Sequence, residues 1–178
     1  GLTNNRLILF KSSSNNSYTQ NGVDYIAVSR SNIGGGTNIQ AGLNRAYDIL
    51  RSASSSDAIP VIILLSDGAP TYYHTNLKDF RMTDSGKSGT GNTTHDRNAA
   101  WTIAQAAYMK VKMPELQIYT IPFSLDSNDP DFNIATATLN PTPENLAKLS
   151  QFNTIWNSEI IGNKNIVPAV DAGKMATY

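Results

Sequence analysis

The chain has 178 residues, enough for one domain with a buried core, and it contains no cysteine. Disulfide bonds, thiolate catalysis and cysteine-ligated zinc are therefore excluded. Lysine plus arginine and aspartate plus glutamate number 14 each, so no global field favours a nucleic-acid or anionic membrane partner. Apolar runs fall well short of the ~20 residues of a membrane span, and we expect no membrane insertion.

The first part of the chain predicts two strands and a helix. Residues 6–10 (RLILF) and 25–28 (YIAV) are apolar runs separated by a Ser/Asn-rich stretch, and we expect a hairpin of antiparallel neighbours. Three glycines then precede residues 39–50, where the apolar residues keep helical spacing. This spacing predicts a helix with one buried face.

The middle of the chain begins with its most apolar segment, residues 59–65 (IPVIILL). Such a run is typical of a parallel-sheet strand that is covered on both sides. The polar stretch that follows, rich in Gly and Ser, predicts a loop insertion over 72–98. Alanine-rich helical spacing then predicts a helix over 97–112.

The last predicted elements are a strand and a helix. Residues 117–123 (QIYTIPF) predict the strand, and Thr142, Pro143 and Glu144 form the start signal of a helix over 143–152. Strands and helices alternate along the chain, which indicates an α/β fold. We expect a single domain over 1–178. The tail from residue 156 gives no clear signal beyond a candidate strand at 165–170 (NIVPAV).

Two polar residues at the ends of these elements could carry chemistry. Asp67 ends the apolar strand in VIILLSDGAPT, and ligands of open α/β sheets bind outside the carboxyl ends of strands. It could also simply cap its turn. Thr37 follows the glycines and either caps the helix or faces a ligand. Together, a hydroxyl and a carboxylate with no thiolate or nearby histidine make a hard oxygen site suited to Mg²⁺.

These segments resemble a known family. GGGTNIQAGLNRA and VIILLSDGAPT resemble the second and third metal-binding loops of a von Willebrand factor A (vWA) domain, RLILFKSSS and YIAVS its second strand and antiparallel edge strand, LQIYTIPF its fifth strand and TPENLAKLSQ a late helix. The resemblance implies a doubly wound, Rossmann-like, mostly parallel sheet with helices on both faces. It also implies a metal-ion-dependent adhesion site that holds Mg²⁺, or Mn²⁺ or Ca²⁺, with Thr37 and Asp67 as ligands.

One part of the family pattern is missing. The first, central strand of the family ends in Asp-x-Ser-x-Ser, whereas DSGKS at Asp84 and DAGKM at Asp171 match only in part. The chain thus resembles a fragment that lacks the first strand and helix. Because an unfilled centre would expose apolar edges, we expect a segment preceding Gly1 in the parent polypeptide to supply the strand. Alternatively, residues 165–175 (NIVPAVDAGKM) supply it.

Other candidate sites are weaker. SGKSGTGN lacks the first glycine and the preceding strand of a phosphate-binding loop. His74 and His95 are too few for zinc and are expected at the surface. The oxygen-rich stretch 126–131 lacks the Gly and the distal Glu of a calcium loop, and we expect a turn.

The resemblance implies an extracellular adhesion domain without enzymatic activity. The long polar loop, the absent cysteine and the Asn/Ser/Thr-rich composition favour a bacterial pilus or surface adhesin that binds a host or matrix protein through a divalent cation. An alternative is a structural scaffold of a pilus or envelope complex with a degenerate metal site, which the missing Asp-x-Ser-x-Ser favours. A Mg²⁺-dependent hydrolase would need a general base near Asp67, and the sequence identifies none.

Overall fold

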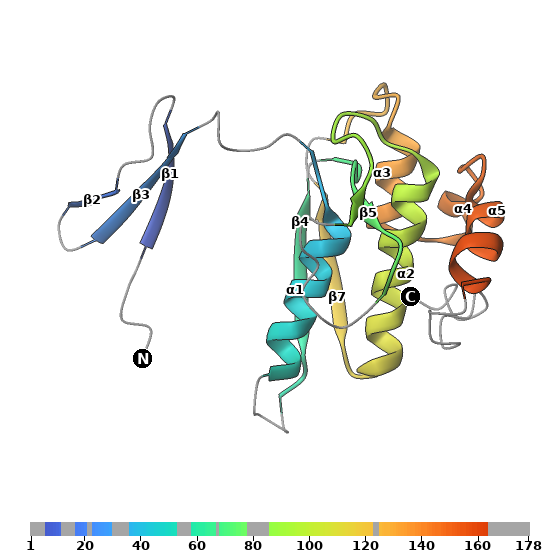
Figure 1. Ribbon diagram of the computed structural model, residues 1–178, viewed down its shortest axis with the longest axis horizontal. Helices are drawn as coiled ribbons and strands as arrows, with labels where there is room; N and C mark the ends of the chain where they lie inside the picture. The colour runs from blue at the N-terminus through green and yellow to red at the C-terminus, as the bar shows by residue number, and fades with distance from the viewer. Residues whose placement is uncertain are drawn as a thin grey trace. The chain divides into compact units, whose positions relative to one another are not determined.

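The computed structural model describes residues 6–11, 17–20, 23–29, 36–52, 58–66, 68–77, 86–122 and 125–163. They belong to two compact units, Gly1–Gly35 and Gly36–Tyr178. The described parts contain both helices and strands (Figure 1), which confirms the mixed α/β class.

The first unit contains three strands, β1 (Arg6–Lys11), β2 (Ser17–Gln20) and β3 (Val23–Ser29), with β3 in the middle. β1 runs parallel to β3, with Leu7 opposite Tyr25, and β2 runs antiparallel to β3. The predicted hairpin between 6–10 and 25–28 is therefore wrong. The hairpin partner of β3 is β2, because the two residues between them suffice for an antiparallel turn, whereas parallel strands need a longer connection.

The second unit is built on two parallel strands, β4 (Val61–Ser66) and β7 (Gln117–Pro122). Their register runs from Val61 opposite Gln117 to Ser66 opposite Pro122, so both strands end at the same edge. Helix α1 (Ile39–Ser52) and helix α2 (Asp96–Lys112) pack against each other beside this pair (Figure 1). The strands predicted at 59–65 and 117–123 and the helices predicted at 39–50 and 97–112 are confirmed within a few residues.

Helix α2 forms the centre of the core. It is in contact with α1, with α3 (Phe132–Leu139) and with α5 (Phe152–Ile155). Ala99, Ala100 and Ala104 are fully buried, and such small side chains let neighbouring helices approach closely. Trp101 and Met109 fill the remaining space and are also fully buried.

The late part of the chain forms shorter helices than expected. Thr142 accepts a hydrogen bond from the Asn145 N–H at 3.3 Å, which confirms the predicted cap, but α4 (Pro143–Leu146) ends well before residue 152. Asp96 at the start of α2 accepts bonds from the Ser150 hydroxyl and the Gln151 N–H, at 3.1 and 2.5 Å. Both bonds join the start of α2 to the segment between α4 and α5.

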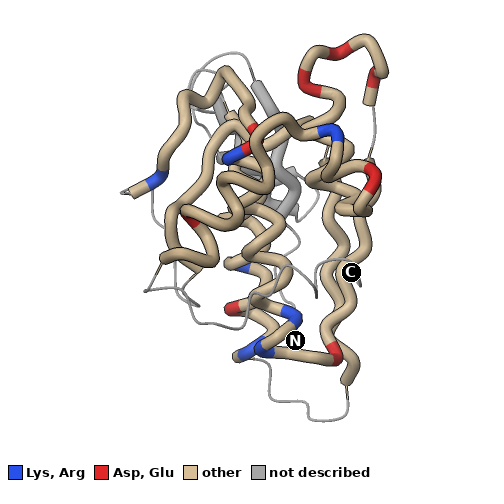
Figure 2. The backbone as a smooth tube through the Cα atoms, turned by 90° about the vertical axis from the view of Figure 1, so that its right-hand side faces the viewer, with Lys and Arg blue, Asp and Glu red and all other residues tan. Residues whose placement is uncertain are grey.

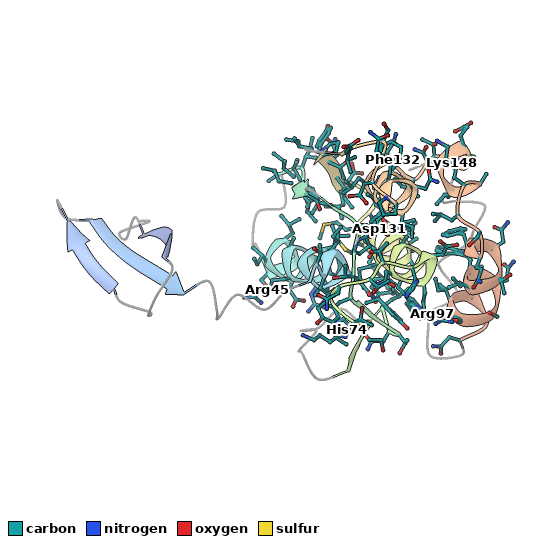
Figure 3. The ribbon with its side chains drawn as sticks, turned by 90° about the horizontal axis from the view of Figure 1, so that it is seen from above. Arg45, His74, Arg97, Asp131, Phe132 and Lys148 are labelled. Carbon is teal, nitrogen blue, oxygen red and sulfur yellow. The ribbon has the colours of Figure 1, made fainter. Side chains whose placement is uncertain are left out.

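A π-helical segment, η2 (Trp156–Ile161), follows α5 and closes the described chain. Trp156 is buried and stacks on Phe152 with ring centroids 5.4 Å apart. Glu159 pairs with Arg97, labelled in Figure 3, through Nε and Nη2 contacts of 2.9 and 2.6 Å. This hydrogen-bonded pair raises the pKa of Arg97 above its ordinary value.

One face of the β4–β7 pair is open. Val61, Ile63 and Leu65 on β4 and Tyr119 and Ile121 on β7 are 42 to 61% exposed. The opposite face, which includes Ile62, Leu64 and Ile118, packs into the core with the helices. We expected β4 to be covered on both sides and helices to lie on both faces of the sheet. Among the described residues, neither expectation is met. An apolar run predicts buried side chains but does not show what covers them.

Candidate functional site

The residue that caps helix α1 is Asn38. Its Oδ1 accepts a hydrogen bond from the Ala41 N–H at 3.0 Å, the usual geometry of a cap one residue before the helix. The interpretation of Thr37 as the cap is therefore wrong. Thr37 is half-buried, and its hydroxyl has no hydrogen-bond partner among the residues that the structure describes.

The main chain of Thr37 is fixed by the loop after β4. The Thr37 N–H donates to the hydroxyl of Thr71 at 2.7 Å, and the Thr37 carbonyl accepts from the N–H groups of Thr71 and Tyr72 at 2.9 and 3.0 Å. The loop before α1 and the loop after β4 therefore meet. Ligands of open α/β sheets bind where such loops come together, outside the carboxyl ends of the strands.

Glycines make this meeting of loops sterically feasible. Gly36 has φ of +103°, and a Cβ atom there would overlap the Tyr72 ring and lie 2.7 Å from the Cα of Gly91. Gly91 has φ of +81°, and a Cβ atom there would also overlap Tyr72. The tyrosine ring thus fits between two glycines that come from different segments. Lys87 lies over the same ring, with its Nζ 4.4 Å from the centroid.

The described part of the predicted 72–98 loop folds back onto this site. β5 (Tyr73–His74) and β6 (Lys87–Ser88) form a short antiparallel pair. Further along, the buried hydroxyl of Thr94 donates to the carbonyl of Pro70. The last three residues of the predicted loop belong to α2, which begins at Asp96.

His74 is buried, which corrects the expectation of a surface histidine. It is 3% exposed, and its main chain bonds twice to Gln40: the His74 N–H donates to Oε1 at 2.7 Å and the His74 carbonyl accepts from Nε2 at 3.1 Å. Its ring Nε2 lies 3.3 Å from Nδ2 of Asn38. These contacts link β5 to the first turn of α1. His74 is labelled in Figure 3. His95, by contrast, is exposed and precedes α2.

Ser66, the last residue of β4, makes a local hydrogen bond. The buried Ser66 hydroxyl donates to the Gly68 carbonyl at 3.1 Å, so this hydroxyl is already engaged. Asp67, between these two residues in sequence, lies outside the described residues. Within the described part, no three His, Asp or Glu side chains gather as a potential metal site. The predicted ligands Thr37 and Asp67 remain a hypothesis; a hydroxyl and a carboxylate, completed by water, are oxygen donors that Mg²⁺ accepts.

The other acidic candidates divide into a turn and segments outside the described residues. Oδ1 of Asp126 accepts from the main-chain N–H and from Nδ2 of Asn128, both at 2.9 Å, and Oδ1 of Asp129 accepts from the Asp131 N–H at 2.8 Å. These local bonds confirm the predicted turn. Asp84 and residues 165–175 lie outside the described residues.

No protein-family model, curated protein or solved structure matches this chain. The resemblance to vWA domains therefore remains a hypothesis carried by the sequence motifs. In the described parts of the chain, no helix has the length and apolar character needed to cross a membrane.

Sequence reasoning missed three parts of the site. Asn38 is a strong capping residue directly before the helix, and that signal was available beside Thr37. Thr71 and Tyr72 gave no local signal, because their role depends on contacts with Thr37. Thr37 lies 34 residues before Thr71 in the sequence. The glycines at 89 and 91 in the polar loop were the available sign of a close approach between segments.

Proposed function

We propose that this chain is a vWA-like adhesion domain of a bacterial pilus or surface adhesin, which binds a host or matrix protein through a divalent cation. The observation that carries the proposal is how the main chain and the hydroxyl of Thr37 are bonded. Its main chain is held by Thr71, and the helix cap is supplied by Asn38. Its hydroxyl has no partner within the described residues, so it is both positioned and available for a ligand.

The residues present fit a hard cation. The Thr37 hydroxyl and the Asp67 carboxylate would hold Mg²⁺, or Mn²⁺ or Ca²⁺, which prefer oxygen donors. When bound, the cation supplies a positive charge that an acidic side chain of the partner can approach. Tyr72, seated between Gly36 and Gly91, keeps the threonine loop close to the end of β4. The chain itself thus supplies the positioning, and no general base is required because no bond is broken.

The open sheet face supports a second partner in this proposal. Parallel sheets in α/β proteins are covered on both faces, whereas Ile63 and Leu65 are 61 and 59% exposed. We infer that a further polypeptide segment covers this face. An extracellular or cell-surface location belongs to the same proposal.

The same face favours the alternative function. A pilus or envelope subunit that docks on the apolar face would make the domain a structural scaffold, and the metal site could then be degenerate. The two functions differ in how binding depends on the cation. Adhesion requires Thr37 and the cation, whereas subunit docking requires Ile63 and its neighbours.

Binding of the intact parent protein to immobilised matrix proteins tests the two functions. For adhesion we expect binding in Mg²⁺, a loss of at least about tenfold in EDTA, which is about 1.4 kcal/mol, and a similar loss for Thr37→Val. Asn38→Ser keeps a capping oxygen and is the matched control that should bind normally. Binding that is unchanged in EDTA and in Thr37→Val would overturn the cation-dependent function.

A further inference from the structure

A cavity of about 160 Å³ lies between α2, the covered face of β4 and β7, and the end of α3. Aliphatic side chains from several elements line it, among them Leu64 on β4, Ile103 on α2, Ile118 on β7 and Leu139 on α3. It is therefore on the helix side of the sheet, opposite the open face. The elements that meet there are all within the described part of the second unit.

The threonine hydroxyls in the cavity wall already have partners. Thr102 donates to the Asn98 carbonyl at 2.8 Å, Thr120 to the Leu139 carbonyl at 2.6 Å, and Thr138 to the Ile134 carbonyl at 2.7 Å. Since each hydroxyl proton is committed to a main-chain carbonyl, these side chains offer an occupant few hydrogen-bond donors. Apart from the Asn140 amide and Lys110, the wall is thus largely apolar in what it presents.

Lys110 gives the cavity its charge. Among the described residues that line the cavity, it is the only one with a charged side chain. It lies in the last turn of α2, which also contains Lys112. Figure 2 shows basic positions at this end of the helices. Burial lowers the pKa of Lys110 below its ordinary value, because the ammonium is incompletely hydrated there. Lys110 already takes part in an interaction within the chain, but its ammonium has three N–H donors, so a carboxylate can bind beside that partner.

We propose that this cavity binds a small monocarboxylate with one aromatic ring or a short alkyl chain. The apolar part would lie among Leu64, Ile103 and Ile118, and the carboxylate would pair with the Lys110 ammonium. Size supports this class, since an apolar cavity of about 150 Å³ accommodates one benzene molecule. This site is separate from the proposed cation site and does not depend on it.

Titration of the full chain with benzoate, followed by amide chemical shifts, tests the proposal, with benzyl alcohol as the neutral probe. We expect saturable benzoate shifts centred on residues of the cavity wall such as Thr102, Thr120 and Leu139. Lys110→Met should weaken benzoate at least fivefold and leave benzyl alcohol nearly unchanged. Lys112→Met, two residues along the same helix, is the control and should bind benzoate normally.

A second variant fills the cavity instead of changing its charge. Ala106→Leu places three more carbon atoms against the wall and should abolish binding of both probes; if it fails to fold, Lys110→Met still decides the matter. The absence of saturable shifts in the wild-type chain up to about 50 mM benzoate, a range that covers weak fragment binding, would overturn the proposal. Equal weakening by Lys112→Met would also overturn it, because the effect would then be one of general charge.

Discussion

Thr37 and Thr71 are joined in both directions through the main chain of Thr37. The Thr37 N–H donates to the Thr71 hydroxyl at 2.7 Å, and the Thr71 N–H donates to the Thr37 carbonyl at 2.9 Å. Two short bonds of this kind fix the position of the Thr37 Cα, and neither of them uses its side-chain hydroxyl. Residues 36–38 before α1 are therefore tied to residues 71–72, which follow β4.

A pair of neighbouring substitutions separates capping from ligand binding. Asn38→Ala removes the oxygen that accepts from Ala41 and should lower the free energy of unfolding by about 1 kcal/mol. Thr37→Val keeps the β-branched shape and removes only the hydroxyl, so we expect a change within about 0.5 kcal/mol. Urea denaturation of both variants provides the measurement. A larger loss for Thr37→Val than for Asn38→Ala would mean that the threonine has a structural role instead.

Two glycines predict opposite responses to alanine. Gly36→Ala must hold φ at +103° and clashes with Tyr72, so we expect a loss of about 2 kcal/mol or more. Gly42 lies within α1, and a Cβ atom there meets nothing within 4 Å. Gly42→Ala should therefore stabilise the chain by about 0.5 to 1 kcal/mol through helix propensity. Thermal unfolding of the two variants measures the difference, and similar melting temperatures would contradict the packing around Tyr72.

How much of this could be predicted from the sequence depends on the range of the interaction. Helices α1 and α2 and strands β4 and β7 follow from local periodicity and apolar runs, which act within a few residues. The direction of β1 against β3 depends on pairing between distant segments, and the apolar runs do not encode it. The bonds of Asp96 with Ser150 and Gln151 are also long-range, across 54 and 55 residues, and no local pattern shows them.

The site was predictable to a smaller extent. The convergence of the Thr37 loop with the end of β4 follows from the general geometry of strand ends. The choice of Asn38 over Thr37 as the cap depends on where the first helical residue lies, and helix boundaries are uncertain by one or two positions in any sequence. The burial of His74 follows from Gln40, which lies 34 residues away and gives no signal in the local sequence.

The open face predicts an asymmetry between neighbouring isoleucines on β4. Ile62 is 7% exposed in the core, so Ile62→Thr should lower the free energy of unfolding by about 2 kcal/mol. Ile63 is 61% exposed, and Ile63→Thr should change it by less than about 0.5 kcal/mol in the isolated chain. In the intact parent protein, a covering segment should make Ile63→Thr costly as well. Equal costs in the isolated chain would contradict the open face, and no added cost in the parent would contradict the covering segment.

Because of Lys110, we expect the free energy of unfolding to rise at alkaline pH. Burial lowers its pKa in the folded chain below the ordinary value of 10.5. At a pH between the folded and the unfolded pKa, the unfolded chain therefore binds more protons than the folded chain. Stability should therefore increase as the pH rises towards 10.5. Lys110→Met should remove this increase, and Lys112→Met is the control that should keep it. Urea denaturation between pH 8 and 10.5, with each variant compared with wild type, measures the effect; an unchanged profile in Lys110→Met would contradict it.

Whether Thr37 and Asp67 hold a cation can be measured by adding Mn²⁺ to the isotope-labelled chain and recording which amide signals broaden. We expect the broadening to appear first at Thr37, Gly68 and Thr71, to be reversed by competing Mg²⁺, and to disappear in Thr37→Val and in Asp67→Asn while Asn38→Ser keeps it. Broadening centred instead on the acidic turn at 126–131, or unchanged in both ligand variants, would contradict it.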